Sequence, residues 1–187
     1  MKITAVTKRL AGLGGTKWEI HLKAKELINQ GRDIVSLTIG EPDIPTPDAL
    51  VEITIQSMLR GRTGYSDGRG EKGLRLALAE RASRRTGQNI SADQVMCFPG
   101  TQTALYAVLM GVAETGDEVL VGDPMYATYE GVVRATGANM VPVPLHAGNG
   151  FRMTANDVAK AITPLTTALL LTTPHNPTGA ILSEPDI

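Results

Sequence analysis

The sequence is poor in cysteine and has no excess of charge of either sign. Cys97 is the single cysteine among 187 residues, which excludes an internal disulfide bond. The surrounding stretch QVMCFPG is typical of a strand, so we expect a buried, unreactive thiol rather than a nucleophile. The net charge of −1 gives no attraction for nucleic acid or for an anionic membrane surface, and neither is expected as a partner.

Long apolar runs and a Walker A motif are also missing. No apolar run reaches the roughly 18 residues that a membrane-spanning helix needs. The stretch MKITAVTKRLAGLGG lacks the apolar segment of a signal peptide, so we expect a cytoplasmic protein. The stretch PGTQTAL, which joins an expected strand to an expected helix, is neither a Walker A motif nor GxGxxG, so these fingerprints do not predict nucleotide binding there. His21, His146 and His175 show no metal-ligand spacing, so no metal site is predicted, and surface or loop positions are expected for them.

Short apolar segments alternate with helical patterns along most of the chain. Strands are expected at residues 33–40, 93–98, 117–122, 138–145 and 166–173. Helices are expected at residues 17–30, 47–60, 71–85, 101–115, 126–137 and 155–162. This alternation predicts an α/β fold with a parallel-type sheet flanked by helices, and apolar rather than alternating strands indicate that helices cover both faces. The prolines in ANMVPVPL favour an edge position for residues 138–145.

Local signals set several expected helix ends. Thr46 is the expected N-cap ahead of Pro47, and Gly31 and Gly87 are expected to end the helices before them. Ser183 and Asp186 have the spacing of a capping box, so a helix is expected to begin there. We therefore expect the N-terminal part of a longer protein, with a minimal natural domain as the alternative.

A phosphate site is expected where the stretch PGTQTAL joins a strand to a helix. Gly100, Thr101 and Gln102 would direct main-chain N–H groups and a hydroxyl at a ligand above the helix N-terminus. The alternative is an ordinary strand-to-helix turn with Thr101 as the N-cap.

Three further stretches follow expected strands, where ligands gather in parallel sheets. Tyr126 could stack on a flat ligand, or pack on a neighbour at a helix start. Asn176 could present its amide to a ligand oxygen, or belong to an Asn-Pro turn without a ligand. Gly40 permits close approach of the main chain.

Five motifs occur in one order: LTIGEPDIPTP, GYSDGRGEKGLRLAL, PGTQTAL, GDEVLVGDPMYATYEG and TTPHNPTGA. From about residue 17 to 187 the chain resembles the N-terminal half of class I/II aminotransferases, pyridoxal-phosphate enzymes of fold type I. The resemblance implies an N-terminal arm and small-domain segment at residues 1–46. A large cofactor-binding domain at residues 47–187 would be incomplete.

The resemblance also implies roles for individual residues. Cofactor-binding residues would be Gly100, Thr101 and Gln102 for the phosphate, Tyr126 for the pyridine ring, Asn176 for the phenolic oxygen, and Tyr65 for the phosphate of the other subunit. Gly40 would lie near the substrate carboxylate. A homodimer and cis Asp-Pro and Asn-Pro bonds are implied as well, and such a bond would turn the Asn176 amide toward the cofactor.

The implied reaction is transfer of an amino group between an amino acid and a 2-oxo acid. It needs a lysine that forms a Schiff base with the cofactor, and a carboxylate for the pyridine nitrogen. In the family both lie beyond the stretch that matches this chain, so no catalytic residue is assigned here and the chain alone is expected to be inactive. The alternatives are another fold-type-I enzyme, such as a C–S lyase, and a non-catalytic effector-sensing domain of a regulator.

Overall fold

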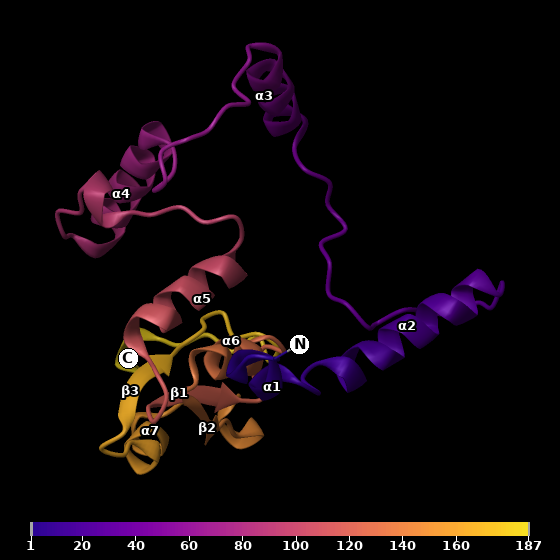
Figure 1. Cartoon of the computed structure of the whole chain (residues 1–187), viewed down its shortest axis with the longest axis vertical. Coiled ribbons are helices and arrows are strands. Elements are labelled where there is room, and N and C mark those ends of the chain that lie inside the picture. The colour runs from indigo at the N-terminus through magenta and orange to yellow at the C-terminus, as the bar shows by residue number, and fades with distance from the viewer. Residues whose placement is uncertain (1, 187) are drawn as a thin grey trace. The chain divides into compact units, whose positions relative to one another are not determined.

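The computed structural model describes residues 2–186, and the chain divides into two compact units. One unit comprises Met1–Arg32 together with Thr101–Ile187, and the other comprises Asp33–Gly100. Figure 1 labels their helices and strands. The first unit contains the sheet.

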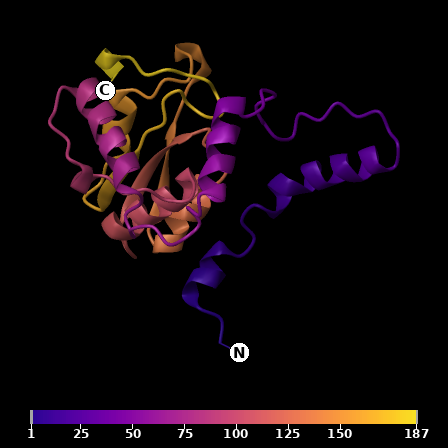
Figure 2. The ribbon, with the colours of Figure 1, turned by 90° about the horizontal axis from the view of Figure 1, so that it is seen from above.

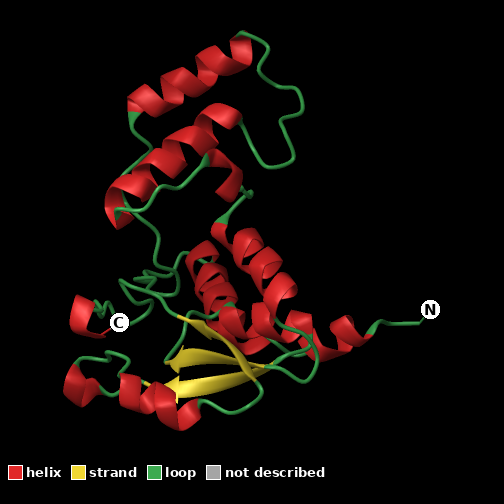
Figure 3. Ribbon diagram, turned by 90° about the vertical axis from the view of Figure 1, so that its left-hand side faces the viewer, coloured by secondary structure: helices red, strands yellow, loops and turns green. Residues whose placement is uncertain are grey.

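The sheet has three parallel strands in the order β2-β1-β3. They are β1 (Glu118–Asp123), β2 (Asn139–Pro144) and β3 (Thr166–Leu170). Helices lie on both sides of the sheet (Figure 3). The predicted α/β class is thus confirmed, and β2 has the edge position that its prolines indicated.

Five α-helices and two short 3-10 helices accompany this sheet among the described residues. The α-helices are α1 (Ala5–Leu10), α2 (Gly15–Asn29), α5 (Thr101–Val112), α6 (Tyr129–Thr136) and α7 (Ala155–Ala161). The 3-10 helices are Ala147–Asn149 and Glu184–Asp186. Half of the predicted capping box is present at the second of these, where the Ser183 main-chain N–H donates to Asp186 Oδ2 at 2.8 Å. The Ser183 hydroxyl donates to the same oxygen at 2.7 Å, and the Asp186 N–H donates to the Ser183 carbonyl at 2.9 Å.

Successive side chains of β1 enter two separate apolar clusters. Val119 and Val121 pack with Leu109 of α5 and Val133 of α6 on one face of the sheet. Leu120 lies in the cluster on the opposite face, against which α7 packs partly buried side chains. Because strand side chains alternate between faces, this buried central strand requires apolar residues at consecutive positions.

The second unit is helical, and two strand predictions in it are wrong. Its elements are α3 (Asp48–Leu59), α4 (Lys72–Thr86) and the 3-10 helix Ala92–Gln94. Residues 33–40 form no strand, and Val35 and Leu37 are 83% and 89% exposed. Residues 93–98 form none either. Neither segment has a neighbouring strand in this unit with which a ladder could form.

The N-cap of α3 and the surroundings of Cys97 differ from those that the sequence predicted. Pro47, not Thr46, occupies the N-cap position of α3 and makes no side-chain cap. Gly87 ends α4 with a φ of 69°, as predicted. Cys97 is half-buried rather than buried in a strand, and its N–H donates to the Arg69 carbonyl at 2.9 Å. Among residues 2–186, no helix combines the length and apolar character required to cross a bilayer.

Arg9 joins α1 to the end of α6. Its Nε donates to the Arg134 carbonyl and its Nη2 to the Ala135 carbonyl, both at 3.0 Å. These carbonyls belong to the last turn of α6, where partial negative charge accumulates, and the Arg134 carbonyl also accepts from the Gly137 N–H at 3.2 Å. Figure 2 shows α1 and α2 following one another near the N-terminus.

We expect Arg9→Ala to release α1 locally. Hydrogen bonds from a charged donor contribute about 1.5–3 kcal/mol, and partial exposure of Arg9 reduces this to about 1 kcal/mol. Amide exchange of residues 5–10, measured by mass spectrometry, should rise about fivefold. Lys8→Ala, an exposed position in the same turn, is the matched control. Equal exchange in the two variants would show that Arg9 does not hold the helix.

Candidate functional site

Two predicted site residues lie in loops at one edge of the sheet. Tyr126 lies between β1 and α6, and Asn176 lies in the segment after β3. Because β1 and β3 are parallel, their carboxyl ends meet at the same edge. Two more predicted residues, Thr101 and Gln102, open α5 in the same unit.

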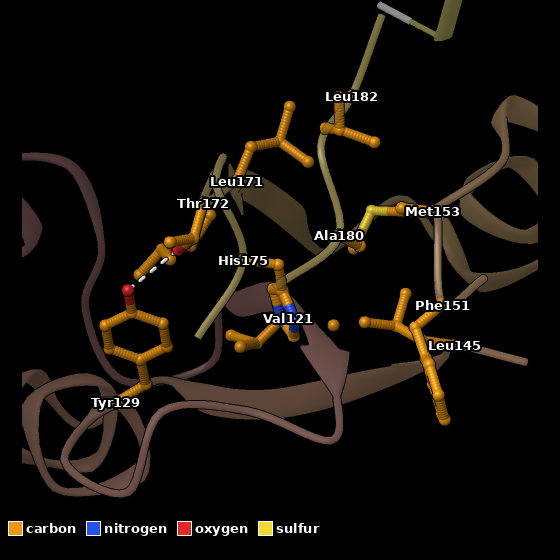
Figure 4. A pocket seen from close by; sticks show the side chains of 12 residues that line it. Val121, Tyr129, Leu145, Phe151, Met153, Leu171, Thr172, His175, Ala180 and Leu182 are labelled. Carbon is orange, nitrogen blue, oxygen red and sulfur yellow. Dashed lines mark hydrogen bonds between the residues drawn. The ribbon is translucent and has the colours of Figure 1, made fainter. Parts of the chain in front are cut away.

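Side-chain contacts connect the start of α5 to the Tyr126 loop, and the start of α6 to the segment after β3. The Thr128 hydroxyl donates to Gln102 Oε1 at 2.7 Å. The rings of Tyr126 and Tyr129 meet edge to face, with centroids 5.5 Å apart and planes at 72°. The Tyr129 hydroxyl shares a 2.7 Å hydrogen bond with the hydroxyl of Thr172, just beyond β3 (Figure 4). The three segments are thus joined by direct contacts, without a ligand.

The turn that carries Asn176 is closed by its own hydrogen bonds. The His175 N–H donates to the Ala180 carbonyl, and the Gly179 N–H donates to the His175 carbonyl, both at 2.7 Å. His175 Nδ1 lies 2.8 Å from the Thr178 hydroxyl. Burial lowers the pKa of His175, which favours the neutral ring. His175 therefore lies in a loop, as predicted, but is half-buried there.

Three peptide bonds around these loops are cis. The predicted Asp123–Pro124 and Asn176–Pro177 bonds are both cis. Thr173–Pro174 is also cis, which the sequence analysis did not predict.

Gly100 immediately precedes α5. It has a φ of 89°, and a Cβ at this position would meet no atom within 4 Å, so the space beside it is open. The first N–H groups of α5 have no intrahelical acceptor and lie at the positive end of the helix. This geometry suits an anion, and binding of the cofactor phosphate stays a prediction.

Gly40 and Tyr65 belong to the other unit, Asp33–Gly100. Both are exposed, and the side chain of Tyr65 is fully so. The structure therefore brings four of the seven predicted residues into one unit, namely Thr101, Gln102, Tyr126 and Asn176. The other three, Gly40, Tyr65 and Gly100, fall in the second unit, and the binding roles of all seven residues stay predictions.

The sequence analysis missed the residues that connect the loops. Thr128 and Tyr129 resembled ordinary residues of a helix start. Thr172 could have been found, because a polar side chain directly after an apolar strand stands at the ligand-binding edge of a parallel sheet. The contact between Tyr129 and Thr172 joins segments 43 residues apart, which no local pattern encodes.

A small pocket lies behind these loops and is lined mostly by apolar side chains (Figure 4). Tyr129, Thr172 and His175 are its polar members. The cavity is about 20 Å³, room for about one or two water molecules. None of the seven predicted residues lines it. It is therefore a gap in the packing beneath the loops and too small for a cofactor.

Comparison with known proteins decides the family. Residues 32–187 match the family model described as aminotransferase class I and II. The chain belongs to this family. Pyridoxal phosphate is the general cofactor of class I and II aminotransferases, so the resemblance drawn from the sequence is confirmed at the level of the family.

Individual relatives are similar over nearly the whole chain. An arginine–pyruvate transaminase of Pseudomonas aeruginosa is 48% identical over 182 residues, covering 97% of this chain and 46% of the relative. An aspartate aminotransferase of Thermotoga maritima is 34% identical, covering 94% and 47%. The structure of Thermus thermophilus aspartate aminotransferase with maleate has a TM-score of 0.90 at 33% identity, covering 99% and 48%. The chain spans just under half the length of these relatives.

Proposed function

We propose that this chain supplies much of the cofactor-binding region of a pyridoxal-phosphate-dependent aminotransferase. The enzyme would exchange an amino group between an amino acid and a 2-oxo acid. The observation that carries this proposal is the series of contacts that links the start of α5 to the Tyr126 loop, and the start of α6 to the segment after β3. We propose the same division as the sequence indicated, with a small-domain segment at residues 1–46 and a large domain at residues 47–187. We also propose a cytoplasmic location.

The hydrogen-bond donors and the aromatic ring at this site suit pyridoxal phosphate. Main-chain N–H groups at the start of α5 and the Thr101 hydroxyl suit a phosphate. The ring of Tyr126 is 40% exposed and offers a face to a pyridine ring, while the Asn176 amide can donate to its phenolic oxygen. When bound, the cofactor supplies an electron sink for chemistry at the substrate α-carbon. The residues of this chain would hold and orient it.

No catalytic residue is assigned within the chain. The lysines are Lys2, Lys8, Lys17, Lys23, Lys25, Lys72 and Lys160. None of them lies in β1 or β3 or in the loops that follow these strands. We therefore expect the lysine that moves the α-proton to come from a further part of the polypeptide.

An assay of the complete polypeptide tests the proposed reaction. With added pyridoxal phosphate, we expect alanine to form from pyruvate when arginine is the donor, since an arginine–pyruvate transaminase is 48% identical to this chain. The 187-residue chain alone should not exceed the rate of free cofactor. Release of thiol and pyruvate from a cysteine conjugate, without amino transfer, would instead establish a C–S lyase. Binding of an amino acid without turnover of any would favour an effector sensor.

Tyr65 is proposed to bind the cofactor phosphate of a partner subunit in a homodimer. A phenol donating to a phosphate oxygen contributes about 1.5–3 kcal/mol, so Tyr65→Phe should weaken binding of pyridoxal phosphate about ten- to hundredfold. Binding of pyridoxal, which lacks the phosphate, should not change. Tyr106→Phe is a control at another exposed tyrosine. An equal loss of affinity for pyridoxal phosphate and for pyridoxal would show that Tyr65 does not bind the phosphate.

Mixed dimers separate action across the interface from action within a subunit. One subunit carries Tyr65→Phe and the other lacks the downstream lysine. If Tyr65 serves the partner's site, both defects fall in one site and the other site retains normal cofactor affinity. If Tyr65 acts within its own subunit, the site that retains the lysine shows weakened affinity, and the role across the interface is wrong.

A further inference from the structure

Arg75 of α4 is a charged side chain that is only 4% exposed. Its Nε donates to the Gly70 carbonyl at 3.1 Å, and its Nη1 donates to the Ala92 carbonyl at 2.9 Å. A buried guanidinium is costly unless its donors are paired. These two bonds therefore connect the glycine-rich segment before α4 to the 3-10 helix after it.

Two carboxylates compensate the buried charge. Asp67 and Asp93 each lie 3.8 Å from the Arg75 guanidinium. Arg69 bridges the same two acids, at 3.8 Å from Asp67 and 3.1 Å from Asp93. Two cations and two anions thus surround one segment of main chain. This arrangement is more specific than an isolated surface pair, which contributes little.

The segment itself is folded against this cluster. The Arg69 N–H donates to Asp67 Oδ1 at 2.8 Å, and the Gly70 N–H donates to the Asp67 carbonyl at 2.7 Å. Gly70 has a φ of 96°, and a Cβ there would lie 2.7 Å from Cys97 Cβ. The Cys97 N–H closes the contact by donating to the Arg69 carbonyl at 2.9 Å. Residues 67–70 consequently have one tightly constrained path.

Tyr65 lies two residues before this constrained turn and is fully exposed. An exposed side chain can serve a phosphate reproducibly only if the main chain beneath it is fixed. We propose that Arg75 is a positioning residue, which fixes residues 67–70 and thereby presents Tyr65 to the cofactor phosphate. This inference rests on the role of Tyr65 proposed above, and it adds a buried residue that does not touch the cofactor.

Amide exchange of the complete enzyme tests the fixing of the turn. In Arg75→Gln, exchange at residues 67–70 should rise at least tenfold, because the bonds to Gly70 and Ala92 and the charge are weakened or lost. Arg84→Gln is the matched control on the same helix, since Arg84 is 71% exposed and pairs only at the surface with Glu80, at 3.4 Å. Arg75→Lys retains the charge without the fork of donors and should give an intermediate rate. Unchanged exchange in Arg75→Gln would overturn the proposal.

A second variant guards against a general folding defect. The side chain of Asp93 is 80% exposed, so Asp93→Ala removes a partner of Arg75 without opening the core and retains the Asp67 carboxylate that accepts from the Arg69 N–H. It should also raise exchange at residues 67–70 while leaving β1 protected. If β1 exchanges faster as well in both variants, Arg75 acts on the fold in general and the proposal is wrong.

Cofactor binding gives a measurement that would not change if Arg75 had only a structural role. The quantity is the ratio of affinities for pyridoxal phosphate and pyridoxal. Arg75→Gln should lower this ratio about as far as Tyr65→Phe, and the double variant should lower it no further. If Tyr65→Phe lowers the ratio and Arg75→Gln does not, the positioning role is wrong while that of Tyr65 stands. If Tyr65→Phe leaves the ratio unchanged, the proposed role of Tyr65 fails, and with it the link from Arg75 to the phosphate.

Discussion

Leu120→Ala is expected to lower the free energy of unfolding by about 3 kcal/mol or more. Leu120 lies in the central strand at 0% exposure and packs with Val143, Leu145 and Met153. Removing its side chain costs the transfer free energy of the lost carbons and leaves a cavity in the cluster on this face of the sheet, which the close-packed neighbours fill only in part. Urea denaturation followed by circular dichroism measures the loss.

Leu169 provides the matched control. It is paired with Leu120 in the parallel register of β1 and β3, but it is 39% exposed. Leu169→Ala removes the same atoms from the neighbouring strand and should cost about 1 kcal/mol or less, because part of the side chain already meets water. Similar losses in the two variants would contradict the burial described for β1.

Gly137→Ala is expected to be comparably destabilising for a different reason. Gly137 caps α6 with a φ of 102°, a conformation that costs a residue with a side chain about 1–2 kcal/mol. A Cβ there would also collide with Thr115 Oγ1 and lie 3.3 Å from Thr115 Cα. Overpacking of this kind costs about 1–3 kcal/mol, so the total should reach about 3 kcal/mol.

Gly87 separates the two causes. It caps α4 with a φ of 69°, yet a Cβ there would meet no atom within 4 Å. Gly87→Ala should therefore carry the conformational cost alone, about 1 kcal/mol. Adding Thr115→Ala to Gly137→Ala should recover part of the remaining loss in the same denaturation experiment. If Gly87→Ala is as damaging as Gly137→Ala, the contact with Thr115 contributes nothing.

The sequence predicted the sheet well and the second unit poorly, for one physical reason. Residues 117–122, 138–145 and 166–173 are apolar runs that do pair with one another, so their expected strands are present. Residues 33–40 and 93–98 are similar runs without a partner strand in their unit. A strand is completed by main-chain bonds to another segment, and composition alone cannot supply that segment.

Some residues of the candidate site could be predicted from the sequence and others could not, for a similar reason. The edge rule for parallel sheets selected Tyr126 and Asn176, because it depends only on where strands end. It could not select Tyr129 or Arg75, since their partners are distant or are main-chain carbonyls. Thr172 hydrogen-bonds to Tyr129 across 43 residues, and Arg75 reaches the Ala92 carbonyl across 17. Such partners become visible only when the chain is folded.

The contact between Arg9 and α6 has a consequence for the order of events on the ribosome. The arginine and its carbonyl acceptor at Arg134 are separated by 125 residues. At about 5–20 residues per second, translation needs roughly 6–25 seconds to add that stretch. Helix α1 is thus synthesised well before its docking surface on α6 emerges. During that interval the newly made helix has no partner on α6 and is accessible to chaperones and proteases.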